Sequence, residues 1–227
     1  MTDLLTPAES EALLLSLRVA FVAVFAAMPL AVAAALLLAR ARFPGKVVVD
    51  GIIHMPLVLP PVAVGFLLLT IFGTRAGLGG WLFQTFGIRF VFSWTGAALA
   101  AGIITFPFQV RAIRIALESA DCGLDEAAET LGAGWFDRFA NVTLPLAFPG
   151  IVAGVITAFA ASLGEFGAII TFVSNIPGET RTLPLAIYTA LQTPGGEVEA
   201  AKLSLLSILL ALVFMTLAEF LQRRMRR

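Results

Sequence analysis

Residues 13–38 read LLLSLRVAFVAVFAAMPLAVAAALLL, and Arg18 is the only charged residue among these 26. About 20 apolar residues in a helix span the hydrocarbon layer of a bilayer, because each residue rises about 1.5 Å. The stretch therefore predicts a transmembrane helix. The chain starts Met1-Thr2-Asp3, without the basic residues typical of a signal peptide, so we expect this span to be retained.

The composition of the whole chain fits this interpretation. Of the 227 residues, 59% are hydrophobic and 13% are charged, whereas soluble domains carry about 25% charged residues. The net charge is zero, which gives no indication of a nucleic-acid partner. The single cysteine, Cys122, excludes an internal disulfide and a cysteine-based metal cluster.

Four further stretches are long and apolar enough to span a membrane: Ile52–Phe72, Phe90–Val110, residues 146–170 and Ala200–Leu221. Between the last two, Leu183–Gln192 has a helical pattern but is too short to span, which is typical of a re-entrant or interfacial helix. The sequence thus predicts one all-α transmembrane domain over residues 1–227, with five transmembrane helices.

The basic residues predict the orientation, because Lys and Arg in short loops concentrate on the cytosolic side. With five spans and a cytosolic first loop, ten basic residues lie inside and four outside. The ten are Arg40, Arg42, Lys46, Arg111, Arg114, Arg138, Arg223, Arg224, Arg226 and Arg227; the four are Arg75, Arg89, Arg181 and Lys202. We therefore expect the N-terminus outside and the C-terminus inside.

One large cytosolic loop, residues 111–145, carries two short amphipathic helices in this interpretation. The first is expected over Leu124–Leu131 and the second over Trp135–Leu144, ending at Pro145. Gly132 and Gly134 between them permit a sharp turn. Neither helix is stable alone. We expect the second to pack on the cytosolic ends of the spans and the first, with its small-residue face, to insert into a groove on a soluble partner.

The spacing in this loop resembles the EAA loop of the permease subunits of ABC importers. Glu126-Ala127-Ala128 is followed after three residues by Gly132 and after nine more by Val142-Thr143-Leu144-Pro145, with Val142 where that family has Ile. The resemblance implies the type I ABC-importer transmembrane fold. It also implies that the loop is the coupling helix that docks into the ATPase subunit, through Glu126, Ala127, Ala128, Leu131, Gly132 and Pro145.

Other strings resemble the molybdate-importer permeases, with the sulfate permeases as near relatives. These strings are FPGK (43–46), HMPLVLPP (54–61), SLGEFGA (162–168) and NIPGETRTLP (175–184). The resemblance implies a homodimer in the inner membrane of a bacterial cell, with the pathway at the interface. It also implies two ABC ATPase subunits, an extracytoplasmic substrate-binding protein, and molybdate as the transported solute.

The chain itself carries no recognisable chemistry. It has no Gly-Lys-Ser/Thr phosphate-binding loop, so we expect ATP hydrolysis by a separate subunit and no catalytic residue here. Its only histidine, His54, excludes a histidine-based metal site. We interpret His54 as a helix-end residue bonded to backbone or water, and expect no cofactor.

Glu165 follows the fourth predicted span, where a charge at membrane depth is costly. A carboxylate lining an oxyanion path would repel a dianion, so we expect Glu165 to cap or pair at a bend, with Arg181 as a possible partner. The candidates for the pathway or gate are Ser162, Glu165, Asn175 and Arg181. Pro60, Pro61 and Pro107 are candidate helix bends.

Three alternatives remain open. A sulfate or tungstate permease would use the same fold, because all three anions are tetrahedral dianions. A secondary transporter coupled to an ion gradient would show paired buried ionisable groups and internal repeats, but the chain has one such carboxylate and no clear repeat. A membrane-embedded enzyme would need a catalytic cluster, which the sequence lacks.

Overall fold

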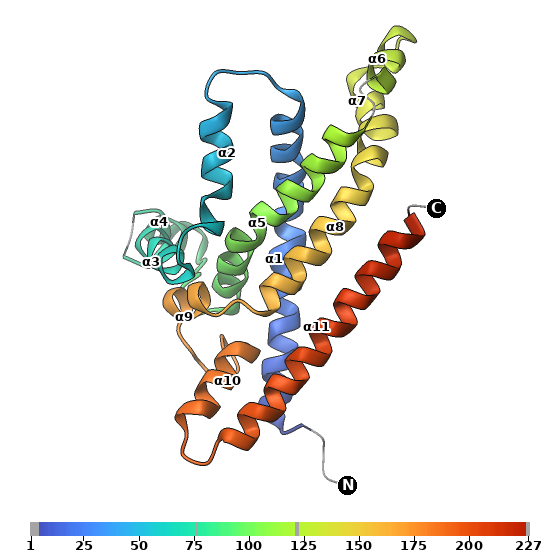
Figure 1. The fold of residues 1–227 in the computed structure, drawn as a ribbon. Helices are drawn as coiled ribbons and strands as arrows, with labels where there is room; N and C mark the ends of the chain where they lie inside the picture. Colours follow the sequence, from blue (N-terminus) through green and yellow to red (C-terminus); the bar gives the residue numbers. More distant parts are fainter. Residues whose placement is uncertain (1–4, 76, 121–122, 226–227) are drawn as a thin grey trace.

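Every regular element in the described part of the chain is a helix. The computed structural model describes residues 5–75, 77–120 and 123–225, so Cys122, Arg226 and Arg227 lie outside it. The elements are α1 (Pro7–Arg40), α2 (Lys46–His54), α3 (Pro61–Phe72), α4 (Gly77–Phe86), α5 (Trp94–Ser119), α6 (Gly123–Thr130), α7 (Trp135–Arg138), α8 (Leu144–Leu163), α9 (Gly167–Val173), α10 (Leu183–Gln192) and α11 (Glu197–Met225) (Figure 1).

Four helical stretches of the described residues are long and apolar enough to cross a membrane: α1, α5, Trp135–Leu163 and the apolar part of α11. A fifth span exists if α2 and α3 count as one, but these helices are bent by 108°. The number of spans thus agrees with the prediction. A straight helix over Ile52–Phe72 was wrong.

The bend between α2 and α3 follows from the prolines. A short 3-10 turn, Met55–Leu57, ends α2, and Pro60 is extended with φ −55° and ψ 131°. Pro61 is the first residue of α3, where its missing N–H costs nothing. A residue that precedes proline is disfavoured in the helical region. The consecutive prolines therefore stop one helix and start the next.

Small residues bring the long helices close together. A Cβ on Gly150 of α8 would lie 2.7 Å from the carbonyl oxygen of Ala112, and one on Gly154 would lie 3.0 Å from Cα of Gln109. Gly150, Gly154 and Ala158, spaced by four residues, are all buried. Membrane helices associate through such small-residue stripes, since lipid gives no hydrophobic drive between apolar surfaces.

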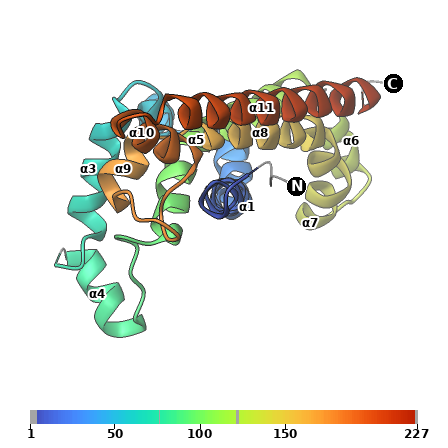
Figure 2. The ribbon, with the colours of Figure 1, turned by 90° about the horizontal axis from the view of Figure 1, so that it is seen from below.

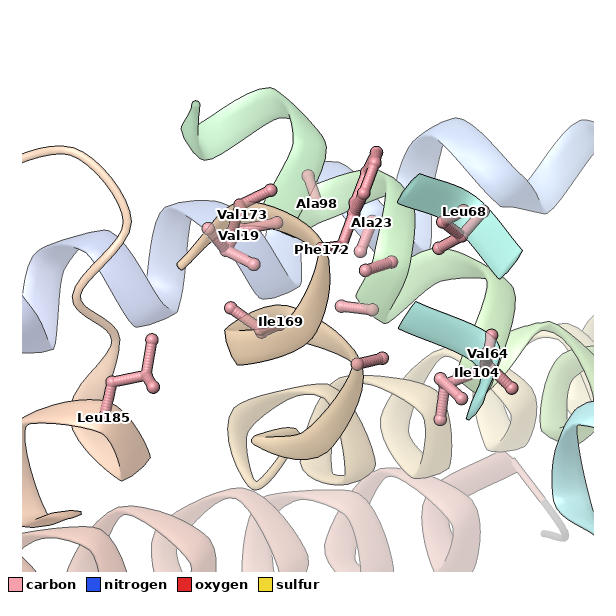
Figure 3. Packing of buried hydrophobic residues seen from close by; sticks show 14 of the residues in the cluster. Val19, Ala23, Val64, Leu68, Ala98, Ile104, Ile169, Phe172, Val173 and Leu185 are labelled. Carbon is pink, nitrogen blue, oxygen red and sulfur yellow. The ribbon is translucent and has the colours of Figure 1, made fainter. Parts of the chain in front are cut away.

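The main core lies where α1, α3, α5 and α9 meet. Phe172 and Ile169 of α9 are completely buried and point toward residues of α1 and α5, including Ala23 and Ala98 (Figure 3). Gly65 of α3 contributes by omitting a side chain, because a Cβ there would lie 2.6 Å from the carbonyl oxygen of Ala168. The short helix α9 is thus held inside the bundle.

Two helix boundaries differ from the prediction. The third span was expected to end at Val110, but α5 continues to Ser119, because an ion pair between Arg114 and Glu118 supports the added turns. A helix end was expected at Pro145, but the chain stays helical through it. Phe139–Thr143 forms a π-helical turn, in which Leu144 N–H bonds to the Phe139 carbonyl, and this absorbs the proline.

The helices place the two predicted loop regions at opposite ends of the bundle. Figure 1 shows α6 and α7 at the end where α1 and α11 finish, and α10 at the end where α1 begins. The short helix α10 has the bounds that the sequence predicted, Leu183–Gln192. Helix α4 was not predicted, and it projects away from the bundle (Figure 2).

Candidate functional site

The predicted coupling helix exists as α6, one residue earlier than expected at both ends. It closes with hydrogen bonds from Gly132 N to the Glu129 carbonyl (2.9 Å) and from Ala133 N to the Ala128 carbonyl (3.0 Å). Gly132 has φ +86°, which any larger residue adopts at a cost. The glycine of the motif therefore forms the turn between α6 and α7.

The tip of this helix pair exposes large apolar side chains. Leu131 is 88% exposed, Trp135 72% and Phe136 74%. Ala127 is also exposed and Ala128 is half-buried, while the side chain of Glu126 is outside the described set. Such an apolar tip needs a cover on another molecule. The expectation that the second helix packs on the spans was right only for Phe139 and Val142, which are half-buried.

One ion pair fixes the two short helices relative to each other. Arg138 Nη1 of α7 donates to Glu129 Oε2 of α6, and the Arg138 side chain is mostly buried. Trp135 stacks on Phe139 with nearly parallel rings, 5.7 Å between centroids. The exposed tip is therefore presented by a preformed unit.

Glu165 lies at the break between α8 and α9. Its Oε1 accepts a hydrogen bond from Ala168 N at 2.8 Å, and the residue is buried. A carboxylate at the N-terminus of a helix satisfies free N–H groups and complements the helix dipole. Glu165 therefore caps α9, as expected. Ser162, one turn earlier, is also buried, and its Oγ has no partner among the described residues.

The expected pairing of Glu165 with Arg181 was wrong. Arg181 Nε instead donates to Asn175 Oδ1 at 2.9 Å, and Asn175 Nδ2 donates to Thr189 Oγ1 at 2.8 Å. Two of the four pathway candidates are thus brought together by the loop before α10. Pro107, the third bend candidate, is buried inside α5, which continues through it.

Three polar contacts were missed by the sequence reasoning. Arg114 of α5 donates to Asp50 of α2 at 3.0 Å, and Lys202 of α11 donates to Glu9 of α1 at 2.6 Å. Gln109 is buried in α5 and donates to the Val24 carbonyl of α1 at 3.3 Å. Intramembrane polar residues were the only available signal, because their partners are 64, 193 and 85 residues away.

His54 was interpreted correctly. Its Nδ1 lies 2.9 Å from the Asp50 carbonyl oxygen and 3.0 Å from Asp50 Oδ1, so the ring is bound at the end of its own helix. The described residues hold no group of three or more metal-ligating side chains.

A bundle of apolar helices with an exposed helix pair at one end suits a transport subunit, and comparison with known proteins decides the family. Residues 20–227 match the family described as binding-protein-dependent transport system inner membrane component. The chain belongs to this family. It is therefore an inner-membrane transport subunit rather than an enzyme, and it operates with an ATPase and a substrate-binding protein, as binding-protein-dependent ABC importers do.

The permease is similar along its whole length to curated relatives. It is 55% identical to the molybdenum transport system permease protein ModB of Escherichia coli, over 97% of this chain and 96% of the relative. It is 51% identical to ModB of Haemophilus influenzae, over 96% of each chain. It is 37% identical to the sulfate transport system permease protein CysT of Escherichia coli, over 83% of this chain and 69% of the relative.

Solved structures show the same fold. A bacterial ABC transporter involved in alginate import matches with a TM-score of 0.76 at 20% identity, over 98% of this permease and 82% of that chain. An amino acid ABC transporter matches with a TM-score of 0.66 at 21% identity, over 96% of the permease and 94% of that chain. The permease therefore has the transmembrane fold predicted for type I ABC importers.

Proposed function

We propose that the permease is the membrane-spanning subunit of an ATP-driven importer that translocates molybdate. The proposal rests on one combination. The spaced EAA motif lies on an exposed helix at one end of the bundle, in a chain 55% identical to a molybdenum transport permease over nearly its full length.

The coupling role is assigned to the segment from α6 to Leu131. Its exposed apolar tip fits a groove on an ATPase subunit, as an amphipathic helix fits the hydrophobic groove of a partner. Gly132 sets the angle of the tip, and the Glu129–Arg138 ion pair transmits its displacement to α7 and the continuous helix above it. Pro145 lies in that helix and marks where the coupling unit joins α8.

The proposed assembly contains two copies of the permease, two ABC ATPase subunits and one substrate-binding protein outside. One solved neighbour is an alginate transporter in complex with its periplasmic binding protein, matched with a TM-score of 0.76. The basic-residue pattern supports an N-terminus outside, which puts α6 at the cytosolic end and α10 at the outer end. We assign the outer gate to the segment that contains Asn175 and Arg181.

ATP binding closes the ATPase subunits and moves the coupling helices together, which turns the pathway outward. The anion then enters from the binding protein, which performs most of the selection. The permease needs only a weakly polar path, because a deep binding site would slow release. The capped position of Glu165, with one oxygen held by Ala168 N, keeps its carboxylate engaged in structure, and Ser162 supplies a buried hydroxyl beside it in sequence.

The test is transport by the reconstituted complex. The permease is co-purified with its ATPase and placed in proteoliposomes. ATP hydrolysis and uptake are measured with the binding protein loaded with molybdate, tungstate or sulfate. We expect stimulation by the molybdate-loaded protein and a weaker interaction with the ATPase for Gly132→Ala, with Gly45→Ala, another left-handed glycine (φ +89°), as the matched control. Equal assembly of Gly132→Ala and wild type would contradict the coupling role, and uptake of sulfate alone would reassign the substrate.

A further inference from the structure

A cavity of about 720 Å³ lies between the second half of α1 and the helix pair that carries the coupling tip. Its α1 wall is apolar and includes Val32, Ala33 and Leu36. Its other wall is formed by Trp135 and Phe139 of the segment that follows α6. This cavity plays no part in the proposed coupling or pathway.

The cavity has a charged end and an apolar end. Two guanidinium groups line it, those of Arg40 and Arg138, and none of its lining residues is acidic. Arg138 uses Nη1 for Glu129, but its Nε is buried and has no hydrogen-bond partner among the described residues. A buried donor without a partner costs free energy unless a ligand accepts from it. The charged end is therefore ready for an anionic acceptor.

The location selects the kind of ligand. Arg40 is the last residue of the long membrane helix α1, so the charged end lies at the membrane boundary and the apolar wall extends toward the hydrocarbon. Trp135 adds an amphipathic ring of the type that concentrates at this boundary. A water-soluble anion would leave the apolar wall uncovered, and a neutral lipid would leave both guanidinium groups without an anionic partner.

We infer that this cavity binds an anionic phospholipid of the leaflet that contains the coupling end. The phosphate accepts from Arg138 and Arg40, and one acyl chain lies along α1 over Val32 and Leu36. Basic pockets between membrane helices are known to suit such head groups. The bound lipid fills the space between α1 and α7, and so supports the base of the coupling unit from the membrane side.

The experiment uses the complete transporter in micelles of neutral phosphatidylcholine, titrated with phosphatidylglycerol and observed by native mass spectrometry. We expect phosphatidylglycerol to bind each permease copy in preference to phosphatidylcholine. Arg138→Gln and Arg40→Gln should each weaken binding about five-fold, since a basic residue at an anionic surface contributes about 1 kcal/mol. Ala33→Trp should block the cavity and abolish binding, because Ala33 lines it and is not part of the buried core.

Two controls separate this site from general attraction and from loop damage. Arg42→Gln removes an exposed charge two residues beyond Arg40 that does not line the cavity, and should bind lipid as wild type does. Glu129→Gln breaks the α6–α7 ion pair but keeps the guanidinium, and should retain lipid. Equal losses for Arg42→Gln and Arg138→Gln, or equal binding of both lipids, would overturn the inference. Displacement by inorganic phosphate alone, or unchanged binding in Ala33→Trp, would also overturn it.

Discussion

Asp50 Oδ2 accepts a hydrogen bond from Arg114 Nη1 at 3.0 Å, and this ion pair joins α2 to the last turns of α5. Arg114 Nε also donates to Glu118 Oε1 at 2.7 Å, so one guanidinium connects three charged groups in total with itself. Helix α2 has no buried residue. Its attachment to α5 therefore depends strongly on this pair, and α5 is the helix that leads into the coupling segment.

We expect Asp50→Asn to reduce the stimulation of ATP hydrolysis by the loaded binding protein about five-fold, with little change in basal hydrolysis. The physical reason is that loss of the pair, worth about 1 kcal/mol for partly exposed groups, loosens α2 relative to the helix that carries the coupling unit. Arg111→Gln is the control, because Arg111 is exposed on the same helix. The reciprocal variant Asp50→Arg with Arg114→Asp should restore stimulation, and no rescue would refute a role for the pair itself.

Lys202 Nζ donates to Glu9 Oε2 at 2.6 Å, which ties the start of α1 to α11 across 193 residues of sequence. The same carboxylate oxygen accepts from Thr6 N, as part of a capping box, and Glu9 is 3% exposed. We expect Lys202→Met to lower the free energy of unfolding by about 1–3 kcal/mol, because it leaves a buried carboxylate short of a partner.

Thermal unfolding of the purified permease checks this prediction. Glu11→Gln is the control, since Glu11 is an exposed acidic residue on the same turn of α1. An equal decrease in both variants would attribute the effect to overall charge rather than to the ion pair.

Gly150 of α8 lies so close to α5 that a Cβ would meet the Ala112 carbonyl oxygen at 2.7 Å. We expect Gly150→Ala to destabilise the bundle by about 1–3 kcal/mol, because backbone cannot yield as a flexible side chain does. Gly51→Ala in α2 is the matched control, since a Cβ there has no atom within 4 Å. It should be neutral or slightly stabilising, given the higher helix propensity of alanine. Comparable destabilisation in both would show that helix contact is not the cause.

The predictable part of the fold was the part governed by local patterns. Apolar length gave the spans, and Pro60 with Pro61 gave the position of a bend. The angle of 108° could not be inferred, because it depends on how α3 packs against α9 through Gly65. Helical continuation through Pro145 was missed for a related reason. Local rules favour a helix end at proline, whereas the π-helical turn accommodates it.

The candidate site divides in the same way. Spacing alone identified the motif around Gly132, whose left-handed conformation agrees with its place at a turn. The partners of charged residues could not be read from the chain, because Asp50 and Arg114 are 64 positions apart and belong to helices whose contact is set by the bend. The proposed Glu165–Arg181 pair failed because Asn175, six residues from Arg181, is the nearer acceptor.

Leu131 is 88% exposed at the tip of the coupling unit, in a position where no described residue covers it. We expect Leu131→Ser to weaken co-purification of the ATPase about ten-fold while leaving the melting temperature of the isolated permease unchanged, because full burial of a leucine contributes about 1.5–3 kcal/mol. Leu205→Ser on α11 is the control, since Leu205 is 58% exposed on a membrane helix. Unchanged ATPase binding by Leu131→Ser would exclude the tip from the interface.

Glu165 allows its structural and electrostatic roles to be separated by two substitutions. Glutamine keeps an oxygen acceptor for Ala168 N but removes the charge, whereas leucine removes both. If capping of α9 is the role, Glu165→Gln should support molybdate uptake like wild type. Glu165→Leu should lose about 0.5–2 kcal/mol of stability, the usual cost of losing a helix cap, and should lose uptake with it. Uptake and thermal unfolding measured on the same preparations give the answer. A higher apparent affinity for the anion in Glu165→Gln would instead show that the carboxylate repels the dianion along the pathway.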